Sequence, residues 1–181
     1  MANGGNGAFG KGCMDFEIRY ERPADAQIIR HVTEVAFAVA EHSDGTEGAI
    51  VDALRAADAL TVSLVATIGG EVVGHVAFSP VTIEGRDVGW FGLGPVSVRP
   101  DLHGRGIGTA LIREGLERLS AAGARGCVVL GDPAYYHRFG FEQDAGIRFE
   151  GVPAEYFMRL SLDGSLASGS VAYHAGFSAC R

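Results

Sequence analysis

The stretch that decides the fold of this chain reads Val-Ser-Val-Arg-Pro-Asp-Leu-His-Gly-Arg-Gly-Ile-Gly-Thr and covers residues 96–109. An extended apolar segment ends at Pro100, and the loop after it carries glycines at alternate positions, Gly104, Gly106 and Gly108. An amphipathic helical pattern follows at once. Glycines let the backbone approach an anion closely, and a helix N-terminus offers unpaired N–H groups at the positive end of its dipole. The stretch therefore predicts a cradle for a phosphate or pyrophosphate.

Two common glycine fingerprints do not fit this loop. It lacks the Gly-Lys-Ser/Thr ending of a P-loop, and its glycines alternate instead of following the Gly-x-Gly-x-x-Gly spacing of a dinucleotide fold. Taken alone, the loop is equally compatible with an ordinary tight turn between a strand and a helix. A second feature of the sequence is needed to choose between the turn and the cradle.

The composition indicates one ordered domain. The chain has 181 residues, of which 47% are hydrophobic and 20% charged, so it can bury a sizeable core and is not typical of disorder. The formal net charge is −7 and no basic stripe is visible, which argues against nucleic acid as the main partner. An acidic balance is compatible with a cationic amine substrate, although it is common among proteins in general.

The ends of the chain and its cysteines favour a cytoplasmic location. Residues 1–13 are rich in Gly and Asn and lack the apolar core of a signal peptide, so we expect a flexible leader there and one domain over 14–181. No apolar run approaches the roughly 20 residues that span a bilayer, so no membrane partner is expected. The three cysteines, Cys13, Cys127 and Cys180, have no metal-ligand spacing, which predicts free thiols and no metal.

Hydrophobic periodicity and turn signals predict a succession of strands and helices. Expected strands cover 16–20, 62–68, 72–81, 88–98, 126–130, 156–162 and 171–177, and expected helices cover 23–40, 46–57 and 106–122, with a short helix opening at Asp132-Pro133. Gly69-Gly70 marks a hairpin, whereas Gly94-Pro95 interrupts a strand and marks a bulge or the close approach of a ligand. The order predicts an α/β fold whose sheet has both parallel and antiparallel pairs.

A second informative stretch runs from Leu130 to Phe141 and reads Leu-Gly-Asp-Pro-Ala-Tyr-Tyr-His-Arg-Phe-Gly-Phe. Here a strand ends, a capped helical turn presents Tyr135 and Tyr136, and Gly-Phe is expected to begin another strand. Aromatic packing against the sheet explains part of this segment. A tyrosine is also useful at a site because its phenol, with a pKa of about 10, can donate a proton at neutral pH.

Together the two stretches resemble the GNAT superfamily of acyl-CoA-dependent N-acetyltransferases, over about residues 14–162. The acetyl-CoA motif of that family, Gln/Arg-x-x-Gly-x-Gly/Ala after a Val-x-Val-x-Pro strand, corresponds to the run from His103 to Gly108. The family also has a tyrosine four residues before a Gly-Phe pair, which matches Tyr136 before Gly140-Phe141. Within the superfamily, the sequence is similar to a bacterial subgroup labelled YhbS-like.

The resemblance implies a GNAT-like central mixed parallel and antiparallel sheet, splayed at the CoA site and flanked by helices, with acetyl-CoA as cosubstrate. It also implies which residues hold that cosubstrate: Val96, Ser97 and Val98 along a strand, and the backbone N–H groups of Gly104, Arg105, Gly106, Ile107, Gly108 and Thr109 around the pyrophosphate. A backbone N–H close to Val96 would stabilise the oxyanion. His103 departs from the usual Gln or Arg, which places more weight on the backbone and on the charge of Arg105.

The reaction that the resemblance implies is direct attack of a primary amine on the thioester. Tyr136 would protonate the leaving thiolate of CoA. The amine, with a pKa of about 10, must also lose a proton, and His75 is a candidate base because histidine titrates near neutrality. Glu41, Glu84 and Asp87 are other candidates. For all four residues, an ordinary surface or packing role is the alternative.

Other functions remain open at the level of sequence. The acceptor is a small molecule or a protein amine. A non-catalytic CoA-binding sensor or interaction domain, another acyl donor, and an oxygen or sulfur acceptor are alternatives. The acidic loop 41–47 favours a cationic acceptor, but a solvated loop explains its charge equally well. The segment Tyr173–Phe177 lines the site or makes a homodimer contact, and the sequence does not choose between them.

Overall fold

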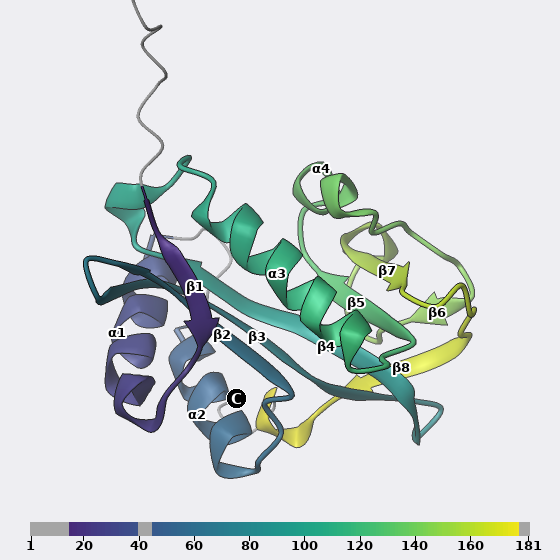
Figure 1. The fold of residues 1–181 in the computed structure, drawn as a ribbon. Coiled ribbons are helices and arrows are strands. Elements are labelled where there is room, and N and C mark those ends of the chain that lie inside the picture. The colour runs from purple at the N-terminus through teal and green to yellow at the C-terminus, as the bar shows by residue number, and fades with distance from the viewer. Residues whose placement is uncertain (1–14, 40–44, 178–181) are drawn as a thin grey trace, which may run out of the picture.

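The structure is a computed structural model that describes residues 15–39 and 45–177 (Figure 1). The expected leader, residues 1–13, lies outside the described residues. The same holds for Ala40, the predicted end of the first helix, and for the candidate base Glu41. The described residues are continuous from the second helix onward, and they contain both stretches that carry the family resemblance.

The strands form a mixed sheet. Its main path follows the order β1 (Glu17–Tyr20), β2 (Val62–Ile68), β3 (Glu71–Ile83), β4 (Arg86–Val98), β5 (Gly126–Leu130) and β7 (Phe157–Ser161). Neighbours on this path run antiparallel except β4 and β5, which are parallel. The far end of β3 pairs with β8 (Gly169–Tyr173), which in turn pairs with the short β6 (Ile147–Arg148). The predicted α/β fold with a mixed sheet is confirmed.

Helices cover both faces of this sheet (Figure 1). α1 (Ala26–Phe37) and α2 (Glu47–Ala56) lie on one face, and α3 (Ile107–Ala121) lies on the other. α4 (Pro133–Tyr136) follows β5 and is continued by a 3₁₀ turn. That turn is His137–Phe139, and further 3₁₀ turns lie at Pro23–Asp25, Pro100–Leu102, Ala154–Tyr156 and Ala175–Phe177.

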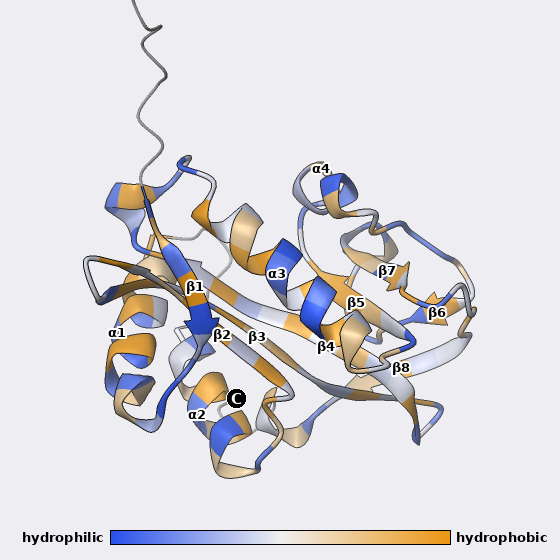
Figure 2. Ribbon diagram, in the orientation of Figure 1, coloured by the Kyte–Doolittle hydropathy of each residue, from blue (hydrophilic) through white to orange (hydrophobic). Residues whose placement is uncertain are grey.

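Alternation along the central strands divides their side chains between two cores. On the α1 and α2 face, Val65 packs with Ile29 and Val51. On the α3 face, the ring of Phe78 lies so close to Gly115 that a side chain there would collide with it. Figure 2 shows the resulting pattern, with apolar central strands and an α3 that carries both hydrophilic and hydrophobic turns. The helix packs on the sheet through one apolar stripe, as its period predicts.

β4 and β5 pair along only part of their length. Their register runs from Trp90 opposite Gly126 to Leu93 opposite Val129 and ends there. Just beyond, the cis-linked Gly94-Pro95 coincides with a bulge, because the register of β4 against β3 shifts at this point. The sheet is therefore splayed between the end of β4 and the end of β5, as predicted.

Two predicted strands differ from the structure. β8 ends at Tyr173, and Ala175–Phe177 forms a 3₁₀ turn in place of the last part of the expected strand. The reason is tertiary: Gly176 packs closely on Leu54 of α2, which requires the chain to bend. After Gly140 the chain makes an isolated bridge between Glu142 and Arg159, where the sequence predicted a strand.

Candidate functional site

Beyond the bulge, β4 directs some of its backbone groups away from β3 and toward the gap in the sheet. In an antiparallel pair, alternate residues direct both of their backbone groups to the partner strand. Arg99 donates its N–H to the carbonyl of Val73 on β3. Ser97, two residues earlier and opposite His75, therefore also directs its backbone groups to β3. Val96 and Val98 therefore direct their N–H and C=O groups to the other edge, into the gap that β5 leaves open.

The glycine loop and the start of α3 lie beside this edge. Gly104 and Gly106 have φ angles of 75° and 83°, in the left-handed region that favours glycine. The first helical hydrogen bond runs from the Ala110 N–H to the Gly106 carbonyl, so the N–H groups of Ile107, Gly108 and Thr109 precede the helical ladder. A pocket of about 470 Å³ lies against these groups. Its size and its N–H donors suit an anionic ligand.

Most of the predicted cofactor residues line this one pocket. They are Val96, Val98, Gly104, Gly106, Ile107, Gly108 and Thr109, and the predicted acid Tyr136 lines it as well. Arg105 is exposed on the loop and Ser97 is buried, and neither is among the lining residues. The Ser97 hydroxyl lies 3.1 Å from the hydroxyl of Thr33 on α1, so its side chain faces the opposite side of the sheet.

His103 takes part in the site through its ring. Its Nε2 lies 2.8 Å from the carbonyl oxygen of Val98. Because a carbonyl only accepts hydrogen bonds, Nε2 carries the proton and donates it. The residue that departs from the family motif thus occupies one of the backbone acceptors at the open edge of β4.

Tyr136 reaches the pocket from α4. The side chain of Asp132 caps this short helix by accepting the Ala134 N–H at 2.9 Å, as the Asp-Pro signal predicts. The Tyr136 ring lies directly against Gly131, where any side chain would collide with it. Burial raises the pKa of Tyr136 well above its usual range, and Tyr135 and Cys127 nearby contribute further. The phenol therefore stays protonated at neutral pH.

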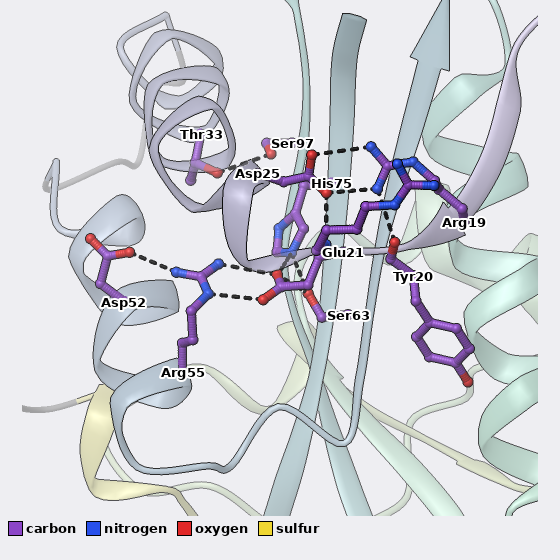
Figure 3. Close-up of polar contacts among 11 residues, drawn as sticks. Arg19, Tyr20, Glu21, Asp25, Thr33, Asp52, Arg55, Ser63, His75 and Ser97 are labelled. Carbon is purple, nitrogen blue, oxygen red and sulfur yellow. Dashed lines mark hydrogen bonds and ion pairs between the residues drawn. The ribbon is translucent and has the colours of Figure 1, made fainter. Parts of the chain in front are cut away.

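His75 lies in a different place, within a polar network on the α1 and α2 face of the sheet (Figure 3). Its side chain is completely buried, and its Nε2 lies 2.8 Å from the hydroxyl of Ser63. Ser63 donates to Glu21 at 2.5 Å, and Glu21 also accepts hydrogen bonds from Arg55 at 2.8 and 3.1 Å. His75 lines neither the pocket beside the glycine loop nor the second pocket described below.

The pKa values of this network follow from its burial and its hydrogen bonds. Burial lowers the pKa of His75, and the neighbouring Glu21 opposes this shift only in part. Burial alone would raise the pKa of Glu21, but hydrogen bonds from His75, Arg55 and Ser63 hold it well below its usual range. The network therefore contains a neutral histidine and an ionised glutamate at neutral pH. In the neutral ring Nε2 carries the proton, and the buried Nδ1 has no partner among the described residues.

The other candidate bases among the described residues hold local structure. Glu84 accepts the Ser170 N–H at 2.6 Å, and Asp87 accepts the Gly89 N–H at 3.0 Å. Both are exposed, Glu84 in the turn between β3 and β4 and Asp87 near the start of β4. Neither residue lines the pocket beside the glycine loop.

A second pocket, of about 540 Å³, lies on the α2 side of the sheet. Gly94 and Leu130 line it where β4 and β5 separate, and Tyr173 and Phe177 line it from the C-terminal segment. Val96, two residues after Gly94, lines the first pocket. The two pockets thus approach the same gap in the sheet from opposite sides.

Neither a metal-binding cluster nor a membrane-spanning helix is present among the described residues. In the ranges 15–39 and 45–177, no group of three or more His, Cys, Asp or Glu side chains is placed to hold a metal ion. No helix in these same ranges has both the length and the apolar character needed to cross a membrane.

Comparison with known proteins identifies the family. A profile of the acetyltransferase (GNAT) domain matches residues 59–143. The chain is also 39% identical over 167 residues to the uncharacterized N-acetyltransferase YhbS of Escherichia coli strain K12, covering 88% of this chain and 97% of that protein. The chain belongs to the GNAT family of acetyltransferases.

Solved structures of other GNAT proteins agree with this assignment. A GNAT acetyltransferase from Brucella melitensis, solved in complex with acetyl-CoA, is 55% identical with a TM-score of 0.82, covering 91% of this chain and 99% of that chain. YhbS from Escherichia coli, solved in complex with CoA, is 35% identical with a TM-score of 0.83, covering 94% of this chain and 96% of that chain.

Four residues of this GNAT acetyltransferase line the first pocket without having been predicted to hold the cosubstrate: Leu102, His103, Tyr135 and Arg138. The Arg138 guanidinium carbon lies 4.6 Å from the centre of the Tyr135 ring, a cation–π arrangement that holds the charge at the pocket wall. Arg138 stands two residues after Tyr136 in the motif that the sequence analysis quoted. That position was the available signal for a further cation at the site.

Proposed function

We propose that this GNAT protein transfers an acetyl group from acetyl-CoA to a primary amine by direct attack. The observation that carries the proposal is the open edge of β4 beside the N-terminus of α3. The backbone groups that Val96 and Val98 direct away from β3 can bond the amides of an extended pantetheine arm, as a neighbouring strand would, with the Val98 carbonyl taken over from His103. The N–H groups from Gly104 to Thr109 can surround its pyrophosphate. The relatives solved with acetyl-CoA and with CoA support the same choice of ligand.

The chemistry follows from the two pockets that approach the gap. A neutral amine entering from the α2 side attacks the thioester carbon, forming the C–N bond while the C–S bond breaks. The oxygen that gains negative charge accepts the Val96 N–H, which the open edge leaves without a strand partner. The amine nitrogen loses one proton and the departing sulfur gains one, so that the products are an amide and the free thiol of CoA.

Tyr136 is the donor that we assign to the departing sulfur. Because burial raises its pKa, the phenol is protonated at neutral pH. A thiol titrates at about 8.5, so complete transfer from the phenol to the thiolate is uphill. Tyr136 therefore acts mainly by donating a hydrogen bond that strengthens as the sulfur becomes negative. We assign His75 a structural role in the buried network rather than a role in proton transfer, since its ring is buried and lines neither pocket.

The test is release of CoA thiol from acetyl-CoA in the presence of a panel of amines, with the acetylated amine identified by mass spectrometry. Tyr136→Phe should lower kcat by about 10²-fold, the size typical of a lost proton donor. The affinity for acetyl-CoA, measured by calorimetry, should stay unchanged.

Tyr135→Phe is the matched control, because this neighbouring phenol lines the same pocket. The Tyr135→Phe variant should have the kcat of the wild type. Equal rates in wild type and Tyr136→Phe would remove Tyr136 from the reaction. Binding of acetyl-CoA without release of CoA for any acceptor, including alcohols and thiols, would contradict the transferase and support a sensor.

A further inference from the structure

The pocket on the α2 side has aromatic walls. The Tyr173 ring lies between two others, with its centre 5.1 Å from that of Phe149 and 4.8 Å from that of Phe177. All three residues line the pocket. The faces of aromatic rings carry negative charge density and attract organic cations.

The charged side chains of this pocket have a single sign. Glu47 at the start of α2 and Glu150 after β6 both line it. Among the described residues that line the pocket there is no lysine, arginine or histidine. Carboxylates beside aromatic faces create a negative potential in a concave site. The site therefore favours a positively charged ligand and disfavours an anionic one.

The phenol of Tyr173 is the third feature of this pocket that suits an amine ligand. Its ring lies directly against Gly92 of β4, two residues before Gly94, where the sheet opens. The hydroxyl is buried and has no hydrogen-bond partner among the described residues. Burial raises its pKa far above the usual range, with contributions from Cys127 and Tyr136. A buried hydroxyl without a partner is costly, which makes it a ready contact for a ligand group.

We propose that this pocket binds a small amine acceptor that carries a second positive charge, such as a diamine. The proposal rests on the proposed acetyl transfer and names the substrate class for it. The nitrogen that attacks the thioester must be neutral, so it cannot be the cation that the carboxylates hold. Glu47, Glu150 and the aromatic walls instead bind a distal ammonium group. The Tyr173 hydroxyl contacts the reacting amine at the end of the pocket where the sheet opens.

The experiment compares three acceptors that share one carbon skeleton: putrescine, butylamine and γ-aminobutyrate. For the wild type, kcat/KM should be highest for putrescine and lowest for γ-aminobutyrate. Glu150→Gln should lower kcat/KM for putrescine about tenfold, the loss expected for one charge-assisted contact, and adding Glu47→Gln should lower it further. The same variants should leave butylamine unchanged. Glu117→Gln, an equal charge change on the exposed face of α3, should alter neither value.

Tyr173→Phe distinguishes the contribution of the end where the amine reacts from that of the end that binds the distal ammonium. Losing a hydroxyl that contacts the reacting amine should lower kcat/KM for putrescine and butylamine alike, by about fivefold. Equal use of putrescine and butylamine, or a preference for putrescine that survives the glutamate variants, would overturn the proposal even if acetyl transfer occurs.

If no acceptor is acetylated, the proposed acetyl transfer is contradicted. Calorimetry then still tests whether the pocket binds a diamine. Putrescine is titrated into the protein saturated with CoA. Binding that is lost in the double glutamate variant supports the pocket as a cation site. The absence of putrescine binding to the wild type overturns it.

Discussion

At the scale of single residues, the position of Tyr136 depends on the glycine beneath it. The ring lies where a Cβ at Gly131 would stand, so Gly131→Ala must displace the ring from the pocket. We expect kcat to fall toward the value of Tyr136→Phe, by about tenfold or more, because a donor displaced by even an ångström loses its hydrogen bond. Steady-state kinetics with saturating acetyl-CoA measure this. Full activity in Gly131→Ala would contradict the assigned position of the phenol.

His103 makes a second prediction at this scale. Its ring donates to the Val98 carbonyl, an acceptor that an extended pantetheine arm would also use. If the two compete, His103→Ala frees the carbonyl and should tighten acetyl-CoA binding by about threefold to fivefold, the value of one ordinary hydrogen bond. Calorimetry of wild type and variant measures the change. Weaker binding in His103→Ala would instead indicate that the ring contacts the cosubstrate directly.

At the scale of elements, α3 allows a test of the anion cradle with an internal control. Gly106 at its start and Gly123 beyond its end have φ angles of 83° and 84°, and neither has a neighbour within 4 Å of an added Cβ. Alanine at either position should cost about 1 kcal/mol of stability through the same backbone strain. Only Gly106→Ala should weaken acetyl-CoA binding, by about tenfold, because its loop relieves the strain by rotating N–H groups away from the pyrophosphate.

Urea unfolding and calorimetry of both glycine variants separate the two effects. Equal losses of stability with unequal losses of affinity support the cradle. Weakened binding in Gly123→Ala, at the far end of the helix, would show that general loosening of α3 explains the effect.

The elements also show what the sequence could predict. β2, β5 and α3 match their predicted ranges closely, since each combines a clear period with a glycine or capping signal at its ends. The glycine loop that we propose as the cradle could be located from the sequence because it is built from consecutive residues. β6, with two residues, has no period to detect, and β8 ends where Gly176 meets α2.

The second pocket was less accessible to prediction from sequence. Its walls come from five separate segments, which contribute Glu47, Gly94, Leu130, Phe149 and Tyr173. The acidic loop and the C-terminal aromatic segment are visible in the sequence, but the latter is equally compatible with a dimer contact. Only the topology, in which β8 pairs with the far end of β3, brings these segments to the gap in the sheet.

At the scale of the whole molecule, the network in Figure 3 connects the stability of the fold to pH. It ties Arg55 of α2 to Glu21 after β1, Ser63 of β2 and His75 of β3. His75 has a lowered pKa in the folded state, so below about pH 6.5 the unfolded chain binds a proton that the folded chain does not. Stability therefore falls as the pH drops through this range. The pKa of Glu21 is also lowered in the folded state, so protonation of the unfolded chain causes a further loss of stability below about pH 4.3.

The corresponding measurement is the free energy of unfolding in urea at pH 7.5, 6.5 and 5.5, conditions set by the ordinary histidine pKa of about 6.5. Each proton taken up only by the unfolded state contributes a slope of about 1.4 kcal/mol per pH unit. His75→Gln should lose stability at pH 7.5, remove most of this slope and still transfer acetyl groups. His31→Gln, on the exposed surface of α1, should keep the slope. An unchanged slope in His75→Gln would show that the buried histidine does not govern the response of the fold to acid.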